Sequence, residues 1–410
     1  MKKTMRVLAI YATLALLPVF TNVIELKAQT ATASPAATQG QCTDESKAAW
    51  YADFIKFRTT EPPKAYEPAK KYLAACPTEE GQIPNYLKKW VIAYDKEARK
   101  LKLNDLFINQ RKYAEALTLA KEILADEPDY LPAVIDLGYG GYVLAVTTKN
   151  ESGNSEAINY THKAIQAIES GKAPENWMPF KSKDDALGYL YYSLAYMERT
   201  SNPINALSNY IKAARFEGDM KKSAQTYAAI AAAYENEYAK QSADYEVKYK
   251  GKDESPDSKL AVANINQLVD RIVDALARAV AAAGTDASAQ ASKAKWLERL
   301  TELYKFRNGS DAGLNEMIAG VMSKPLPPVP TPITTLPATA PTTSANGNTS
   351  TVGSTVAPGT GVPPATIKTT TTTPAATGAT TTPPKTTTKI TQTASVKPAP
   401  KPTRNNHRRH

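Results

Sequence analysis

The segment that decides the fold is 111-RKYAEALTLAKEILADEPDYLP-132, which has the apolar spacing of one amphipathic helix. Its apolar side chains recur at steps of three and four residues, which places them on one helical face; they are Tyr113, Ala116, Leu117, Ala120, Ile123 and Leu124. Glu127-Pro128 predicts the end of this helix, because the residue before a proline is disfavoured in the α conformation. Val134, Leu137 and Gly138 begin the next helical pattern directly afterwards.

A bulky residue followed by an apolar and then a small one is a spacing that resembles the tetratricopeptide repeat, TPR. A small residue allows two antiparallel helices to approach closely, and the bulky ones fill the space between successive hairpins. The matching alanines of the second helices are Ala116, Ala157 and Ala206, so the repeats are longer than the usual 34 residues and contain insertions. The resemblance covers about residues 97–240 and implies a right-handed solenoid of helical hairpins.

Outside that region, helical periodicity alone predicts further hairpins. Residues 43–323 are therefore expected to form an all-α domain of about six hairpins. The expected helices are 43–58 with 64–76, 84–109 with 111–127, 131–148 with 155–170, 184–199 with 203–216, 219–249 with 258–283, and 287–307 with 311–323.

Both ends of the chain differ from the middle in composition. Residues 1–28 have a basic start and an apolar run, which is typical of a cleaved bacterial secretory signal. An uncleaved membrane anchor is the alternative, although the run from Val7 to Phe20 is shorter than the roughly 20 residues that span a bilayer. Residues 29–42 are expected to be a disordered linker, and residues 324–410, rich in Pro, Thr and Ala, a disordered basic tail.

If the protein is exported, its two cysteines can form a lasting disulfide, because disulfides persist outside the cytoplasm. If residues 43–58 and 64–76 form an antiparallel hairpin, Cys42 and Cys76 lie beside one another and can form a disulfide. Two buried free thiols are the alternative. Residues 39–41 before Cys42 lack the apolar and small residues of a lipidation site, which excludes a lipid-modified cysteine.

The net charge of +10 is concentrated at the ends of the chain. Residues 1–28 carry +3 and residues 325–410 carry +8, which leaves −1 for the middle. This balance argues against nucleic-acid binding by the folded part, because phosphate recognition needs a concentrated basic face. For the tail, three interpretations remain: a passive spacer, an O-glycosylated stalk, or a basic strand on anionic envelope polymers.

No motif in the sequence indicates catalysis, a metal or a cofactor. His162 has no histidine or cysteine at metal-ligand spacing, and Gly138, Gly140 and Gly141 lack the lysine and serine of a phosphate loop. The glycines are better explained by close contact between helices.

Aromatic residues give the more specific hypothesis. In the TPR family the first helices of successive hairpins line an inner groove, and the resemblance places five tyrosines and one arginine there: Tyr139, Tyr142, Tyr189, Tyr192, Tyr196 and Arg199. Tyrosine offers an apolar face and a hydroxyl at low entropic cost, which suits a peptide or glycan partner. The alternative is that these tyrosines pack between helices as part of the core.

Together these observations predict an exported, non-enzymatic protein, periplasmic or extracellular, that binds or scaffolds a peptide or protein partner in its groove. After signal cleavage no transmembrane span is expected. An envelope-attached structural protein whose tail carries the attachment is the alternative, and an enzyme with an unmarked site is a third.

Overall fold

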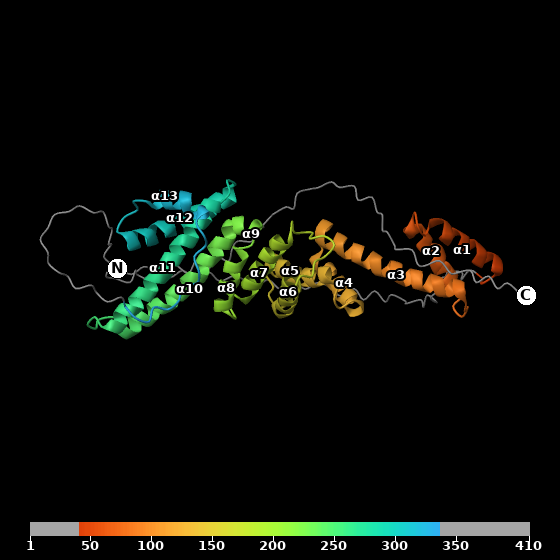
Figure 1. Cartoon of the computed structure of the whole chain (residues 1–410), viewed down its shortest axis with the longest axis horizontal. Helices are drawn as coiled ribbons and strands as arrows, with labels where there is room; N and C mark the ends of the chain where they lie inside the picture. The colour runs from red at the N-terminus through yellow and green to blue at the C-terminus, as the bar shows by residue number, and fades with distance from the viewer. Residues whose placement is uncertain (1–40, 337–410) are drawn as a thin grey trace, which may run out of the picture. The chain divides into compact units, whose positions relative to one another are not determined.

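The computed structural model describes residues 41–336, and every regular element in that range is a helix, which confirms the all-α class (Figure 1). The predicted signal at 1–28, most of the predicted linker and tail residues 337–410 lie outside the described range. The described residues belong to two compact units, 41–92 and 93–336, which divide within helix α3 (Gln82–Asn104).

Unit 1 is built on a helical hairpin of α1 (Asp44–Phe57) and α2 (Pro62–Ala75). The hydroxyl of Thr43 caps α1 by accepting a hydrogen bond from the N–H of Ser46 at 3.2 Å. Phe54 is the centre of the core, with its ring centroid 5.0 Å from that of Trp90 on α3. The edge-to-face geometry of this pair adds to the stabilisation from buried area.

A disulfide bond joins Cys42 to Cys76 in unit 1, with 5.3 Å between the two Cα atoms. The bond links the start of α1 to the end of α2, the positions at which an antiparallel hairpin brings its chain ends together. Lys47 and Glu79 form an ion pair at 3.0 Å beside it. Cys42 is therefore part of the folded unit and not of a disordered linker, because its side chain is covalently bound to the second helix.

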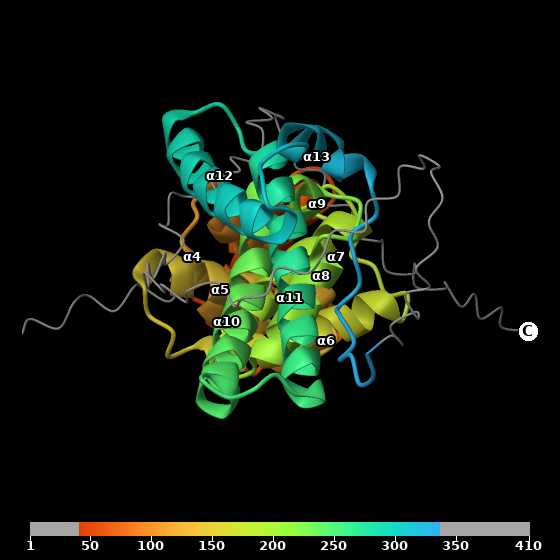
Figure 2. The same ribbon diagram turned by 90° about the vertical axis from the view of Figure 1, so that its left-hand side faces the viewer.

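In unit 2 the helical hairpins pack in the order in which they occur along the chain, and each contacts the next one (Figures 1 and 2). After the end of α3 and a π-helical turn η1 (Asp105–Asn109), its elements are α4 (Tyr113–Asp126), α5 (Leu131–Thr148), α6 (Asn154–Glu169), α7 (Lys183–Glu198), α8 (Pro203–Ala213), α9 (Asp219–Lys222), α10 (Ala224–Tyr249), α11 (Pro256–Ala282), α12 (Ala287–Asn308), α13 (Leu314–Gly320) and the 3-10 turn η2 (Val321–Ser323).

The predicted helix at 219–249 is interrupted, and this is the largest difference among the helical boundaries. Ser223 is extended, with φ −85° and ψ 121°, and separates α9 from α10. Long-range contacts explain the break: the carboxylate of Asp185 on α7 accepts the N–H of Asp219 at 2.8 Å, and Met220 is buried. These contacts hold α9 as a separate turn, which the periodicity of α10 could not indicate.

Close helix approach at Gly138 accounts for one of the glycines in α5. A Cβ atom at this position would lie 2.7 Å from Oγ1 and 2.9 Å from the main-chain N of Thr161 on α6. Helix α5 is also the one helix of the described residues that is long and apolar enough to cross a membrane, and half of it is buried here. Its contacts with α4, α6 and α7 explain why it is apolar on several sides.

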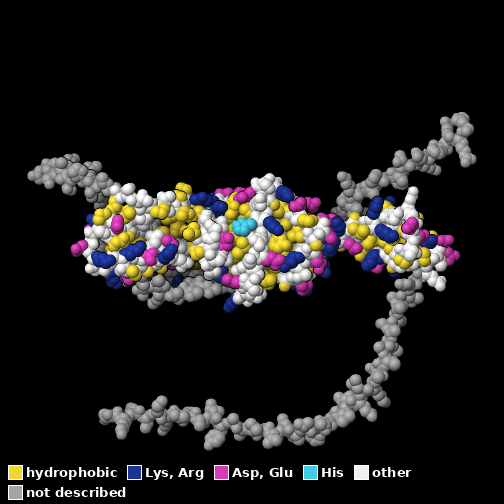
Figure 3. Space-filling model, turned by 90° about the horizontal axis from the view of Figure 1, so that it is seen from below, with side chains coloured by type: hydrophobic (Ala, Val, Ile, Leu, Met, Phe, Trp, Pro, Cys, Tyr) yellow, Lys and Arg dark blue, Asp and Glu magenta, His cyan; other side chains and the backbone are white. Residues whose placement is uncertain are grey.

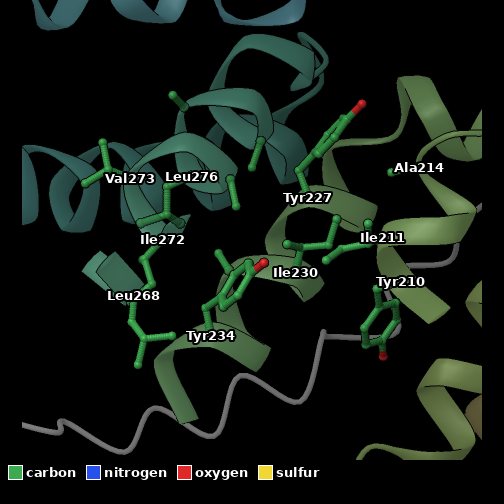
Figure 4. Close-up of a cluster of buried hydrophobic side chains, with 14 of the residues drawn as sticks. Tyr210, Ile211, Ala214, Tyr227, Ile230, Tyr234, Leu268, Ile272, Val273 and Leu276 are labelled. Carbon is green, nitrogen blue, oxygen red and sulfur yellow. The ribbon is translucent and has the colours of Figure 1, made fainter. Parts of the chain in front are cut away.

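The largest core of unit 2 lies where α8, α10 and α11 meet (Figure 4). Ile211 from α8, Ile230 from α10 and Ile272 from α11 are each at most 3 % exposed. Burying such side chains stabilises the fold by about 2 kcal/mol each. This core fixes the position of α11, on which the site described below is built.

Residues 324–336 do not match the prediction of disorder. They are extended and lie along α11, and Figure 2 shows them as the blue irregular segment that descends from α13. A segment of this composition has too little apolar surface to form a core of its own. It is ordered because side chains of α11 bind its main chain.

Candidate functional site

The five predicted tyrosines do come together, at the contact between α5 and α7. Tyr139 and Tyr142 project from α5, and Tyr189, Tyr192 and Tyr196 project from α7. The rings of Tyr139 and Tyr189 lie 5.6 Å apart, and those of Tyr142 and Tyr196 lie 5.3 Å apart. Both pairs meet edge to face, the arrangement that aromatic quadrupoles favour.

The tyrosine cluster, as we call these five side chains, is mostly covered by protein. Tyr196 is 8 % exposed, and the other four rings are half-buried. Burial disfavours the phenolate, which raises the pKa of Tyr192 to about 12 and also raises the pKa of Tyr139 and Tyr142. The rings therefore join α5 to α7. The prediction that these tyrosines line a groove now concerns only the exposed edges of their rings.

Arg199, directly after α7, lies at the end of this cluster. Its guanidinium carbon is 3.9 Å from the ring centroid of Tyr196, and Nη1 donates to the main-chain oxygen of Tyr196 at 2.5 Å. Nη2 forms an ion pair with Glu151 from the loop between α5 and α6. The charge of Arg199 thus ties that loop to α7, and a negatively charged ligand group would have to compete with Glu151. Basic and acidic side chains are interspersed in the same way on the face of unit 2 that Figure 3 shows.

A second polar arrangement, which sequence reasoning missed, lies on α11. Asn264, Arg271 and Arg278 follow one another at intervals of seven residues, so all three lie on one face of α11 about two turns apart. Each donates hydrogen bonds to main-chain oxygens of residues 324–333. We call residues 324–336 the strap and these three side chains the strap site.

Arg278 anchors the start of the strap. Its Nη1 and Nη2 donate to the carbonyls of Lys324 and Pro325 at 3.1 and 3.0 Å, while Nε donates to Asp274 at 2.7 Å. The Arg278 side chain is 3 % exposed. A buried guanidinium is tolerated only when its donors are satisfied, and here one carboxylate and two carbonyls supply the acceptors.

The outer end of the strap is held by two more side chains. Nε of Arg271 donates to the carbonyl of Pro328 at 3.1 Å. The amide of Asn264 pairs twice with Ile333: Nδ2 donates to its carbonyl at 3.0 Å, and Oδ1 accepts its N–H at 2.7 Å. The strap runs antiparallel to α11, because later strap residues meet earlier helix residues.

A small cavity remains under the strap. It has a volume of about 10 Å³, close to the space for one water molecule, and it is lined by Ile211, Ile230, Tyr234, Arg271, Asp274, Ala275, Leu326 and Pro327. The hydroxyl of Tyr234 is buried and has no hydrogen-bond partner in the structure. Its burial raises the pKa of Tyr234 to about 12.

A sequence signal for the strap site existed but was weak. The seven-residue spacing of Asn264, Arg271 and Arg278 marks a polar line on an amphipathic helix. Such a line is usually a solvated helix face. Only the position of the strap shows that these donors have main-chain partners.

Comparisons with known proteins add no relative. No protein-family model matches this chain. No curated protein matches it, and no solved structure does.

Proposed function

We propose that this chain is an exported, non-enzymatic binding module in which residues 43–323 form a right-handed, TPR-like solenoid. The order of contacts in unit 2 supports the proposal, because helices α4 to α8 each pack against the next, as successive hairpins of a solenoid do. The sequence supports export through its amino-terminal pattern. A protein or peptide partner binds along the tyrosine cluster.

The observation that carries this function is the partial exposure of four neighbouring half-buried tyrosines, Tyr139, Tyr142, Tyr189 and Tyr192. Packing against one another fixes their rings before a partner arrives, so binding costs little side-chain entropy. Rigid, partly exposed aromatic side chains are typical of binding hot spots.

The test replaces the four half-buried tyrosines by phenylalanine, which keeps the packed rings and removes only the hydroxyls. Wild type and variant are used to capture partners from an envelope extract, with melting temperature measured for both. We expect the variant to keep its fold and to bind the captured partner roughly tenfold more weakly, since two hydroxyl hydrogen bonds of about 0.7 kcal/mol each give that factor.

The matched control carries Phe at Tyr245 and Tyr249, a ring pair 5.4 Å apart near the end of α10. It removes hydroxyls from another aromatic pair of the same unit and should leave binding unchanged. If wild type, control and cluster variant captured equal amounts of partner, the tyrosine cluster would not be the binding site.

A second candidate function is attachment to the envelope through the basic tail. The strap favours this function, because Arg278, Arg271 and Asn264 hold the beginning of the tail on α11. A pulling force on the tail is therefore transmitted to unit 2. Deleting residues 337–410 while keeping the strap separates the two functions. A groove-binding protein keeps its partner after this deletion, whereas a tail-attached protein loses its place in the envelope fraction.

A further inference from the structure

We propose that the outer part of the strap site, formed by Asn264 and Arg271 beside the cavity at Tyr234, is a binding site for an extended, proline-rich peptide of another polypeptide. Residues 326–336 of the chain itself are its internal and displaceable occupant. This site is separate from the tyrosine cluster, and the proposal does not depend on that cluster binding a partner.

The chemistry of the site matches a proline-rich main chain. Arg271 and Arg278 offer donors only, and they bind the carbonyls of Lys324, Pro325 and Pro328. Proline has no N–H, so a proline-rich segment brings few donors that would need acceptors on this surface. The one strap N–H that the site binds belongs to Ile333, and there Asn264 supplies an acceptor.

The spacing of the contacts also fits. Two turns of α11 separate Arg278 from Arg271, a distance of about 10.5 Å. Three residues of polyproline II helix, from Pro325 to Pro328, cover about 9.3 Å. Such a helix exists before binding, which lowers the entropy that a partner loses.

The two parts of the strap are held by different side chains, so the outer part can be displaced while Arg278 keeps its hydrogen bonds to the start. At its start, the buried Arg278 makes two hydrogen bonds to it. Further along, Pro328 is exposed, Val329 is 44 % exposed and Leu336 is 38 % exposed. There the strap is held by three hydrogen bonds from Arg271 and Asn264, worth about 1 kcal/mol each, and by Leu326, which is half-buried and packs against the core.

The internal occupant also fits the site incompletely. The unpartnered hydroxyl of Tyr234 and the cavity beside Leu326 and Pro327 show that the strap leaves one polar group unsatisfied. A buried hydroxyl without a partner costs about 1 to 3 kcal/mol. A ligand that places one further polar atom in this space and bonds the hydroxyl of Tyr234 gains a contact that the strap lacks.

The experiment measures binding of a fluorescent peptide with the sequence of residues 326–336, LPPVPTPITTL, to the full chain. In one variant, residues 326–336 are replaced by a Gly/Ser segment of equal length, which keeps the anchor on Arg278. A tether holds the strap at an effective concentration of about 1 mM. We expect the peptide to bind the replaced chain at least tenfold more tightly than the wild type.

A milder variant, Ile333→Pro, removes the N–H that Asn264 binds together with the half-buried isoleucine side chain, and should also increase peptide binding. Adding Asn264→Leu to the replaced chain should weaken binding at least tenfold. Lys259→Ala, an exposed position on the same helix, is the matched control and should have no effect. A peptide with every proline changed to alanine should bind at least tenfold more weakly.

Three results would overturn the proposal. The first is absence of binding at about 1 mM peptide to both the replaced chain and the Ile333→Pro variant, with helical circular dichroism unchanged. The second is binding that is insensitive to Asn264→Leu. The third is dimerisation of the full chain, without added peptide, that Asn264→Leu abolishes; the occupant is then a second copy and not a different polypeptide.

Discussion

The side-chain amide of Asn264 pairs with both main-chain polar groups of Ile333, a residue 69 positions later in the chain. One side chain thereby substitutes for the neighbouring strand that an extended segment would otherwise need for its hydrogen bonds. This pair, with Arg271 and Arg278, makes residues 324–336 part of the folded unit. The same contacts connect the interior of unit 2 with the root of the tail.

The disulfide is expected to stabilise unit 1 substantially. It closes a loop with a sequence separation of 34 residues, and the chain-entropy relation gives about 3 to 4 kcal/mol for a loop of that size. The Cys42→Ser, Cys76→Ser variant should therefore be cleaved in α1 and α2 by limited proteolysis much faster than the wild type. Cleavage within unit 2 serves as the internal control, and an unchanged pattern in unit 1 would contradict the prediction.

Gly138 is expected to resist replacement by alanine, although alanine is the better helix former. The new methyl group would lie 2.9 Å from main-chain atoms of Thr161. Overpacking costs about 1 to 3 kcal/mol and exceeds the gain of about 1 kcal/mol in helix propensity. Thermal unfolding should show a melting temperature lower by several degrees.

Gly188→Ala is the matched control for this prediction. Gly188 also lies inside a helix, but a Cβ atom there would meet its nearest neighbour at 3.5 Å, an ordinary contact. This variant should be neutral or stabilised by up to about 1 kcal/mol. If both glycine variants gained stability, the close approach of α5 to α6 would be wrong.

Two tyrosines on α10 should respond oppositely to replacement by phenylalanine. The hydroxyl of Tyr227 donates to the main-chain oxygen of Lys221 at 2.6 Å, and its loss should cost about 1 kcal/mol in the free energy of unfolding. Tyr234 has an unpartnered hydroxyl, so Tyr234→Phe should be neutral or stabilising. Denaturant unfolding compares the two, and a larger loss for Tyr234→Phe would show that its hydroxyl has a partner.

The tyrosine cluster predicts a decrease of stability at high pH. The pKa of Tyr192 is about 12 in the folded protein, mainly because of burial, against about 10 in an unfolded chain. The unfolded state therefore loses its proton first, and the contribution of Tyr192 to stability is complete below about pH 10 and is lost as the pH rises towards 12.

Tyr192→Phe removes this titration. Its melting temperature should fall less than that of the wild type between about pH 10 and 12 and should differ little from it at pH 8. Tyr51→Phe, on α1 of the other unit, is the control and should leave the alkaline unfolding of unit 2 unchanged. A variant that follows the wild-type curve throughout would show that Tyr192 does not contribute to the pH dependence.

Much of the secondary structure could be predicted from the sequence, because helices report on local periodicity. The predicted helix 131–148 coincides with α5, and the predicted pair 43–58 and 64–76 lies within two residues of α1 and α2. Proline and capping residues mark these ends chemically. The break at Ser223 could not be predicted from local periodicity, because contacts of Asp219 and Met220 with distant parts of the chain produce it.

The tyrosine cluster was predictable in its members but not in its arrangement. Periodicity placed Tyr139 and Tyr189 on first helices, yet it could not decide whether their rings face a partner or one another. The structure shows the rings in mutual contact with part of each exposed. The cation of Arg199 was predictable in the same way, whereas its pairing with Glu151 was not.

The sequence by itself determined that the described chain is helical and where most helices begin and end, because the α-helix is held by bonds between residues four apart. Only the tertiary structure decided what the polar line of α11 binds. Composition predicted disorder for residues 324–336, since they bury little apolar surface. Their order comes from donors on Asn264, Arg271 and Arg278, whose proximity depends on how the whole unit packs.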